Sequence, residues 1–473
     1  MLTRLEADGF KNLIDFAVDF GPYTCIAGPN GVGKSNVFDA IQFLSLLADH
    51  SILEAALQVR SRTGDTARLE DLFFRSDTVR KDKFKIAAEM LVDQDVRDDF
   101  GRPGQATSTF LRYEIEIGRR IADSGVNGLT SDLELHSESL QLVRQGDAGK
   151  RLKFPHSKLR FRDSAVRNRR FAKTGYISTE TAGDGPSEII VHQDGGSRGP
   201  GQRAPARTAP RTIVSTTSTI ATPTILAARR EMQKWRLLAL EPSAMRRPDR
   251  LGRDPTAVSD NGAHLAGALN RLKRLDGDSG DVAGRISARL AEFVPVTSVD
   301  VVRDDVRELL SISITETTGQ RFSASAISDG TLRFLALAIL AEDPETGGVL
   351  CIEEPENGIH PERLPSMEGL MRDLAVDTDA AVGHGNVMRQ LILATHSPYL
   401  LQLQEPADIL IARETTMRYR EATIPCFRCY PLAGTWRADK NDHRVLGLST
   451  MYDYLQPPDG AKLRMPFELS SAP

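Results

Sequence analysis

The chain has 473 residues and a mass of 52.0 kDa, which exceeds what one hydrophobic core usually spans. We therefore expect two domains, or one large domain with an inserted lobe. Hydrophobic residues make up 40% and charged residues 26%, which excludes wholesale disorder. Sixty Lys and Arg against 64 Asp and Glu leave a formal net charge of −4, so any site for a polyanion must be local.

The first residues lack the basic and then apolar layout of a signal peptide, and no apolar run approaches the roughly 18 residues that span a bilayer. We expect a cytoplasmic protein. Cys25 and Cys351 lie in apolar runs and are expected to be small buried residues. Cys426 and Cys429 form a single CxxC pair with only His443 as a nearby third ligand, so a zinc site is not favoured.

The N-terminal third of the chain predicts strands around one helix. Residues 1–20 alternate apolar and polar side chains in two runs, which predicts a hairpin at a sheet edge. Residues 23–27 read as a buried strand, and residues 36–47 have apolar side chains at helical spacing. Residues 84–145 alternate again between Gly, Asp and Asn breaks, which predicts an antiparallel subsheet.

A basic segment, Lys150–Lys173, follows this subsheet. It holds ten Lys or Arg against the single acid Asp163. Such a run is either a solvated surface or a contact for nucleic acid. Three phenylalanines lie among the cations and either stack bases or anchor strands; they are Phe154, Phe161 and Phe171. Residues 181–224 are rich in Gly, Pro, Ser and Thr, and we expect no fixed structure there.

Helical spacing returns in residues 225–240, and again in residues 261–275, where Asp260 or Asn261 is expected to cap the helix. These helices predict a helical lobe. From residue 308 onward, two strands, a helix opened by Asp329-Gly330, and the apolar runs VLCI and LILAT follow in turn. Strands that alternate with helices favour an α/β core with a mostly parallel sheet.

A glycine-rich turn carries the clearest chemistry. Gly28 to Ser35 fits GxxxxGK[ST] and lies between a predicted strand and a predicted helix, as a phosphate-binding loop requires. Lys34 is expected to bridge the β and γ phosphates, and Ser35 to bind Mg²⁺. The expected nucleotide-binding residues of this loop are Gly28, Pro29, Asn30, Gly31, Val32, Gly33, Lys34, Ser35 and Asn36.

Acidic residues and a histidine follow two later strands. Glu353 and Glu354 come directly after VLCI, at the strand end where ligands bind in open α/β sheets. We expect Glu353 to hold Mg²⁺ and Glu354 to orient or deprotonate the attacking water. The alternative is an acid-rich helix N-terminus behind Pro355. His396 follows LILAT and is expected to contact the γ-phosphate.

Four motifs together resemble a known superfamily. FKNL with GPNGVGKSN, ISDGTLR at 327–333, IEEPENGIHP and ATHSPYLL are similar, in order, to the first strand and Walker A, the signature, the Walker B with D-loop, and the switch histidine of ABC-type ATPase heads. These heads are the RecF, SMC and OLD-like AAA family ATPases of bacterial antiviral defence and DNA maintenance. The resemblance covers residues 1–48 and 305–405.

The resemblance implies a P-loop NTPase head of α/β class, with a mostly parallel core sheet, an antiparallel subsheet and an inserted helical lobe. The expected parts are a core of residues 1–48 and 305–405, a β-subdomain with the basic segment at 49–180, the excursion 181–224, the lobe 225–304 and an extension 406–473. Any Q-loop glutamine stays unassigned, because Gln42 follows the P-loop too soon.

The resemblance also implies a homodimer in which Ser328, Asp329 and Gly330 of one subunit cover the ATP bound by the other. Asp329 stands where many signatures have Gly, and Glu353 where Walker B usually has Asp. Two functions stay open. One is an Mg²⁺-dependent ATPase whose closure acts on DNA, in defence or repair. The other is a slow, nucleotide-gated scaffold that holds a partner nuclease or toxin. A transporter subunit and a fused nuclease are disfavoured.

Overall fold

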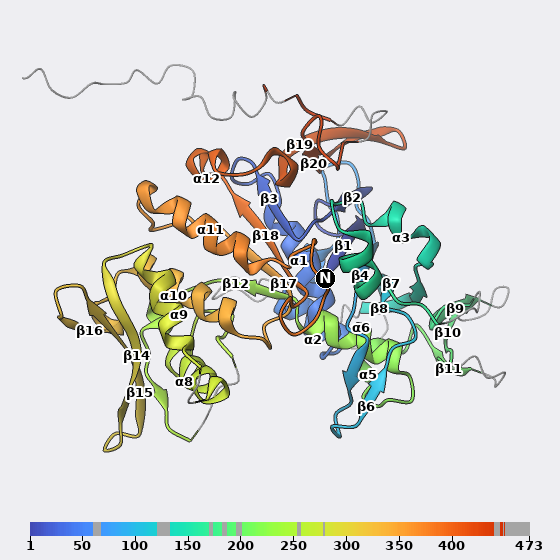
Figure 1. The fold of residues 1–473 in the computed structure, drawn as a ribbon. Coiled ribbons are helices and arrows are strands. Elements are labelled where there is room, and N and C mark those ends of the chain that lie inside the picture. The colour runs from blue at the N-terminus through green and yellow to red at the C-terminus, as the bar shows by residue number, and fades with distance from the viewer. Residues whose placement is uncertain are drawn as a thin grey trace, which may run out of the picture.

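The computed structural model describes residues 1–59, 68–120, 133–169, 174–181, 187–194, 201–252, 257–277, 280–438, 445–447 and 449. Two large sheets dominate it (Figure 1). The first is an eight-stranded antiparallel sheet, which in spatial order contains β11 (Gln202–Pro205), β10 (Ser187–Val191), β9 (Ile177–Thr181), β8 (Leu133–Leu142), β7 (Phe110–Arg119), β4 (Lys83–Leu91), β1 (Leu2–Asp8) and β2 (Phe16–Asp19).

The second sheet has six strands and is parallel except at one edge. Its spatial order is β12 (Arg236–Leu238), β17 (Gly348–Glu353), β18 (Arg389–Thr395), β3 (Tyr23–Ala27), β19 (Ile409–Tyr419) and the antiparallel edge strand β20 (Ala422–Pro431). Every residue of β3 and β18 is buried. Such continuous apolar runs are typical of parallel strands that are covered on both faces.

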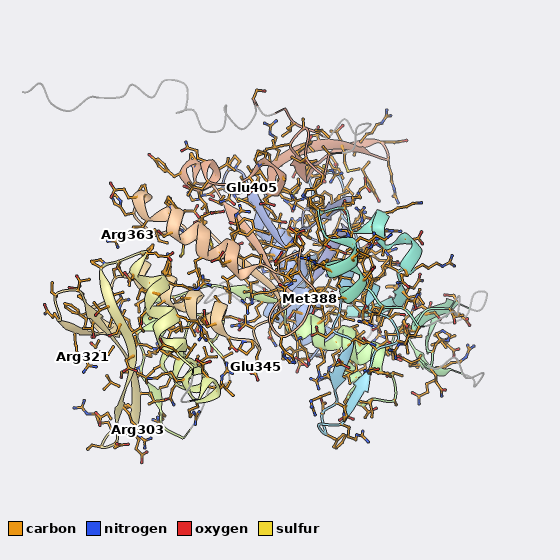
Figure 2. The ribbon with its side chains drawn as sticks, viewed as in Figure 1. Arg303, Arg321, Glu345, Arg363, Met388 and Glu405 are labelled. Carbon is orange, nitrogen blue, oxygen red and sulfur yellow. The ribbon has the colours of Figure 1, made fainter. Side chains whose placement is uncertain are left out.

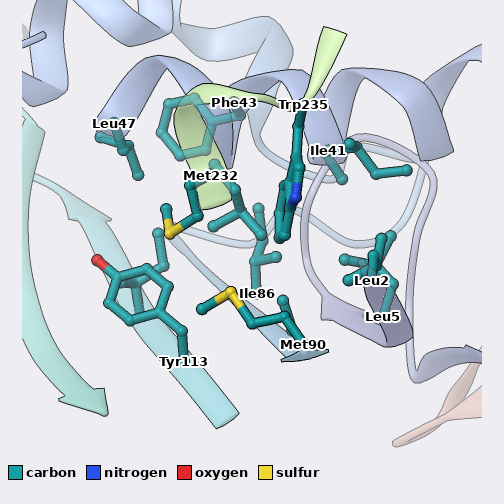
Figure 3. Packing of buried hydrophobic residues seen from close by; sticks show 14 of the residues in the cluster. Leu2, Leu5, Ile41, Phe43, Leu47, Ile86, Met90, Tyr113, Met232 and Trp235 are labelled. Carbon is teal, nitrogen blue, oxygen red and sulfur yellow. The ribbon is translucent and has the colours of Figure 1, made fainter. Parts of the chain in front are cut away.

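Helix α1 (Lys34–Leu47) lies between the two sheets and joins their cores. Figure 3 shows its apolar face, with Ile41, Phe43 and Leu47, against side chains of the eight-stranded sheet such as Leu2 and Ile86. Trp235 completes this packing, with its indole N–H donating to Glu231 at 3.0 Å. The phosphate loop at the start of α1 is therefore held by a core that both sheets share.

A separate lobe, on the left of Figure 1, consists of a small antiparallel sheet and two helices. Its core continues into the long helix α10 (Asp329–Glu342), on which the ring of Phe334 stacks with that of Phe293, with centroids 4.5 Å apart. The exposed cations Arg303 and Arg321 lie on its outer strands (Figure 2). Its elements are α8 (Leu265–Asp276), α9 (Val282–Ala291), β13 (Asp249–Arg250), β14 (Val296–Asp304), β15 (Leu309–Glu316) and β16 (Arg321–Ser323).

The remaining elements are further helices, a short hairpin and single helical turns. They are α2 (Ile52–Gln58), α3 (Gln145–Arg151), α4 (Asp163–Ala165), α5 (Ile213–Thr216), α6 (Pro223–Gln233), α7 (Pro242–Met245), α11 (Leu364–Leu374), α12 (Pro398–Gln402), the hairpin of β5 (Asp95–Arg97) with β6 (Pro103–Gln105), the π-helix η2 (Lys158–Arg162), and the 3-10 helices η1 (Leu69–Leu72), η3 (Ala324–Ala326), η4 (Pro361–Arg363) and η5 (Pro406–Asp408).

The structure corrects several expectations about the middle of the chain. Residues 181–224 are not without structure: their described part contains β10 and β11, which extend the eight-stranded sheet. The expected helix of residues 225–240 ends at Gln233, and Arg236–Leu238 forms β12 at the edge of the six-stranded sheet. The expected lobe 225–304 therefore contributes one strand to the ATPase sheet. His264, and not Asp260 or Asn261, occupies the N-cap position of α8, and its side chain makes no capping hydrogen bond.

The expected extension 406–473 also belongs partly to this sheet, because β19 pairs with β3 and β20 pairs with β19. Cys426 and Cys429 both lie on β20, three residues apart, so their side chains face opposite sides of the strand. Cys426 packs beside Ile14, and burial raises the pKa of Cys429 to about 12. This arrangement does not suit one shared metal, and His443 lies outside the described residues.

Cys25 and Cys351 are buried, as expected. No helix in the described part of the chain is long and apolar enough to cross a membrane. Within the same residues, no group of three or more His, Cys, Asp or Glu side chains is arranged to hold a metal ion by itself.

A buried carboxylate on β8 gives a pH-dependent prediction. Glu138 is fully buried and accepts hydrogen bonds from the backbone N–H groups of Ile213 and Val214 at 2.7 and 3.1 Å. Burial raises its pKa from 4.5 to about 7. The stability that Glu138 contributes is thus present below about pH 4.5 and is lost as pH rises through 7. Between pH 5 and 8 the free energy of unfolding of the wild type should fall more than that of Glu138→Gln, by up to about 3 kcal/mol, as measured by urea unfolding. An unchanged pH dependence in the variant would contradict this assignment.

Candidate functional site

The phosphate loop runs from the end of β3 to the start of α1. Gly31 and Gly33 have φ values of 82° and 111°, which only glycine adopts without strain. Gly28 packs against β19, since a Cβ there would lie 2.6 Å from the carbonyl oxygen of Ala412. Pro29, Asn30 and Gly31 are exposed on the rim. The backbone thus curls as a phosphate-binding loop does.

The turn between β1 and β2 supports this loop from the side. The side-chain amide of Asn12 donates to the carbonyl oxygen of Val32 at 3.2 Å, and its oxygen accepts from Asn36 at 2.7 Å. Lys11 pairs with the buried Asp39 of α1 at 2.6 Å. The FKNL sequence therefore has a structural reason to accompany the phosphate loop, although spacing alone did not single out Asn12.

Lys34 is buried at the base of the loop, with 7% of its surface exposed. Its Nζ donates to the carbonyl oxygens of Gly28 and Pro29 at 2.6 and 2.8 Å. Burial lowers the pKa of Lys34, while the charges of Glu354, Glu353 and Glu356 act in the opposite direction. The ammonium is therefore held among carbonyl and carboxylate oxygens.

The acidic loop after β17 turns sharply toward the histidine. Glu354 has φ 49°, and its N–H donates to the carbonyl oxygen of Ala394 at 2.8 Å. Its Oε1 lies 2.8 Å from His396 Nδ1, and its Oε2 accepts from the side chain of Asn357 at 2.6 Å. The alternative of an acid-rich helix N-terminus is wrong, because residues 354–357 form a turn and α11 begins at Leu364.

Parallel pairing brings these loops together. Glu353 pairs with Ala394 between β17 and β18, and Thr395 pairs with Ala27 between β18 and β3. The carboxyl ends of these strands consequently carry, at one end of the sheet, the phosphate loop, Glu353, Glu354 and His396. Ser35 and Glu353 offer the hard oxygen ligands that Mg²⁺ prefers. The arrangement suits in-line attack on a phosphate, with a carboxylate to accept a proton.

The signature residues lie elsewhere, at the N-terminus of α10, which is well to the left of α1 in Figure 1. Ser328 caps α10 and accepts from the N–H of Thr331. Asp329 pairs with Arg246 at 2.6 Å. A Cβ on Gly330 would approach the carbonyl oxygen of Gly358 to 3.1 Å, so the helix abuts the acidic loop closely.

A cavity of about 240 Å³ lies between the acidic loop, α10 and the segment after β12. Glu241 and Arg333 line it together with Glu353 and Glu354. Arg333 donates to the carbonyl oxygens of Leu240 and Asn357. The described residues that line the cavity include no glutamine, and the one side-chain amide among them belongs to Asn357, which donates to Glu354. Sequence reasoning missed β12, and with it Glu241.

Residues 23–402 match the family described as "AAA domain, putative AbiEii toxin, Type IV TA system". The chain belongs to this family. The resemblance to RecF and SMC-like AAA ATPase heads is therefore confirmed, as is the α/β P-loop fold.

Named relatives are similar in sequence to this chain over shorter stretches. Chromosome partition protein Smc of Thauera aminoaromatica is 28% identical over 127 residues, which are 26% of this chain and 9% of that protein. The Smc protein of Mycoplasma genitalium is 32% identical over 163 residues, which are 31% of this chain and 15% of that protein. The chain thus corresponds to a small fraction of the length of these relatives.

Two solved structures are similar at low identity. The SMC head bound to the C-winged helix domain of ScpA has a TM-score of 0.45 and 12% identity, and the match covers 90% of this chain and 98% of that one. The SMC head domain from Thermotoga maritima has a TM-score of 0.36 and 12% identity, with 91% and 98% covered.

The site gives a prediction about two of its residues. Glu354→Gln should leave ATP binding intact while it abolishes most turnover, because the phosphate loop binds the nucleotide and only hydrolysis needs the carboxylate. Lys34→Ala should instead weaken binding itself. Equilibrium binding of a fluorescent ATP analogue and steady-state phosphate release separate these effects. Wild-type hydrolysis in Glu354→Gln would show that the base is another residue, with Glu353 and Glu356 the next to test.

Proposed function

We propose that this protein is a cytoplasmic ATPase that dimerises around two ATP molecules and couples closure of the dimer to a DNA-directed or effector-directed task. One observation supports the proposal that the protein hydrolyses ATP. The carboxyl ends of three adjacent parallel strands bring Lys34, Glu354 and His396 to one edge, with Glu354 and His396 2.8 Å apart.

The roles follow from this geometry. The backbone N–H groups of residues 28–36 and the ammonium of Lys34 bind the phosphates, and the helix dipole of α1 adds to the attraction. Ser35 and Glu353 would hold Mg²⁺, which would supply neutralisation of the phosphate charge. Glu354 accepts the proton of the attacking water, and Asn357 fixes its orientation. His396 donates to the γ-phosphate oxygen.

Ser328, Asp329 and Gly330 sit at the start of α10, on a different element from the phosphate loop at the start of α1. We therefore propose a two-fold dimer in which these residues close over the nucleotide of the partner. The N–H groups at the start of α10 and the hydroxyl of Ser328 suit an anion. ATP then stabilises the closed dimer, and hydrolysis releases it.

The task of the dimer is proposed from the basic segment and the family. Lys158 and Arg160 are exposed on η2, whereas Arg151 and Lys153 pair with Glu89 and Asp19 at 2.6 and 2.7 Å. The exposed cations support a contact with nucleic acid. The curated Smc relatives are chromosome partition proteins, which supports a DNA-directed task, in maintenance or in antiviral defence.

Base stacking on the phenylalanines of this segment is not part of the proposal. Phe154 and Phe161 are 3% and 0% exposed and pack edge to face with centroids 5.9 Å apart, so they anchor the segment. Phe171 lies outside the described residues. The second candidate, a slow nucleotide-gated scaffold that holds a separate nuclease or toxin, is supported by the toxin named in the description of the family.

Mixing two inactive variants tests the dimer. A mixture of Lys34→Ala and Ser328→Arg chains forms heterodimers in which one composite site is intact and the other carries both substitutions. Phosphate release should recover to roughly a quarter of the wild-type rate, since about half of the dimers are mixed and half of their sites are intact. Full activity in Ser328→Arg alone would mean that each chain hydrolyses ATP independently.

The contact with nucleic acid is tested by reversing charge. Arg167 and Arg169 lie beside residues 107–109, and Arg170 follows outside the described residues. The triple change of these residues to Glu should lower DNA or RNA affinity at least tenfold and flatten its dependence on salt, because fewer counterions are released. Basal ATPase activity should not change. Fluorescence anisotropy at several salt concentrations measures this, and unaltered binding would favour a protein effector.

A further inference from the structure

The acidic loop contains a third carboxylate that the roles above do not use. Glu356 is 9% exposed, although it lies only three residues beyond the strand end that carries Glu353. Its Oε1 accepts a hydrogen bond from Thr395 Oγ1 at 2.5 Å. Its Oε2 is buried and has no hydrogen-bond partner in the described part of the chain.

Thr395 connects Glu356 to two other parts of the site. It is the last residue of β18 and is fully buried. Its Oγ1 accepts from the N–H of Ser397 at 2.9 Å, and its carbonyl oxygen accepts from the N–H of Gly28 at 3.1 Å. One threonine thus bonds the phosphate loop, the acidic loop and the loop that carries His396.

This arrangement is costly for folding alone. A buried carboxylate with one oxygen left without a donor destabilises a protein, and a well-packed apolar pair in its place is often more stable. Buried polar groups that are only partly satisfied are expected where function requires them. The charge of Glu356 also acts on Lys34, where it opposes the lowering of the pKa by burial.

We propose that Glu356 and Thr395 are a positioning pair for hydrolysis, which holds the His396 loop against the phosphate loop. The second oxygen of Glu356 stays open for a hydrogen-bond donor that arrives with bound nucleotide. The inference rests on the proposed ATPase function and assigns neither residue to the chemistry itself. The pair fixes the loops whose side chains, Glu354 and His396, must stay 2.8 Å apart.

Loss of the pair should therefore affect turnover more than binding. Nucleotide binding depends on the backbone of the phosphate loop and on Lys34. The side chains of Glu356 and Thr395 do not take part in the hydrogen bonds that hold Lys34. A displacement of about 1 Å between reacting groups can cost two orders of magnitude in rate. A change in kcat with an unchanged dissociation constant is thus the signature of a positioning role.

Thr395→Val is the sharpest variant, because it preserves volume and β-branching while it removes the hydroxyl. We expect kcat for ATP to fall at least tenfold while the dissociation constant of a fluorescent ATP analogue stays within about twofold. Thr395→Ser restores the hydroxyl and should recover kcat to within about threefold of wild type. Thr346→Val is the matched control: Thr346 is 4% exposed, precedes the opposite end of β17, and has an Oγ1 without a hydrogen-bond partner among described residues.

Glu356→Gln separates charge from hydrogen bonding and serves if Thr395→Val fails to fold. It keeps an acceptor for Thr395 but replaces the open carboxylate oxygen with an amide, so kcat should again fall at least tenfold. All rates are measured well below the unfolding temperature of each variant.

The outcomes are distinct. Wild-type kcat in Thr395→Val or Glu356→Gln, with Glu354→Gln inactive, would overturn the pair and leave the proposed function standing. Parallel loss of kcat and nucleotide affinity would make the pair a support of the phosphate loop and would also overturn the inference. If wild-type protein hydrolyses no ATP, the proposed function fails, and the positioning role fails with it.

Discussion

Parallel pairing of β17, β18 and β3 is the constraint on which the rest of the site depends. Neighbouring parallel strands have their carboxyl ends at the same end of the sheet. The residues that follow Glu353, Thr395 and Ala27 therefore lie close together although they are far apart in the sequence. The hydrogen bonds from the N–H groups of Gly28 and Glu354 to carbonyl oxygens of β18 extend this pairing into the loops. The strand register therefore sets the positions of the phosphate loop, the carboxylates and the histidine together.

The same edge concentrates charge in a buried place. Lys34 loses hydration, and the three glutamates of the acidic loop offset that loss by favouring its charged form. The repulsion between Glu354 and Glu356 is limited because different groups hold them: His396 and Asn357 hold Glu354, and Thr395 holds Glu356. Such a site favours a ligand that brings both negative phosphates and a divalent cation, which would satisfy both kinds of charge.

Local motifs could be predicted from the sequence, and long-range pairings could not. The phosphate loop, the acidic strand end and His396 follow from residue types at short spacing. β12 was mistaken for helix because its leucines continue the apolar spacing of α6, and only its pairing with β17 makes it a strand. β10 and β11 pair within a Gly- and Pro-rich region whose composition favours disorder. The contact between Thr395 and Glu356 joins residues 39 apart, which no local spacing indicates.

Helix α10 connects the segment after β12 with the acidic loop. Arg246 bonds Asp329 and the carbonyl oxygen of Ile327, which ties the start of α10 to the segment after β12. Arg333, one turn further along α10, donates to the carbonyl oxygens of Leu240 and Asn357. The side chain of Asn357 in turn donates to Glu354, so hydrogen bonds connect α10 to the carboxylate of its own chain. The start of α10, where Gly330 abuts the carbonyl oxygen of Gly358, and the loop that carries Glu354 are thus joined by direct polar and packing contacts.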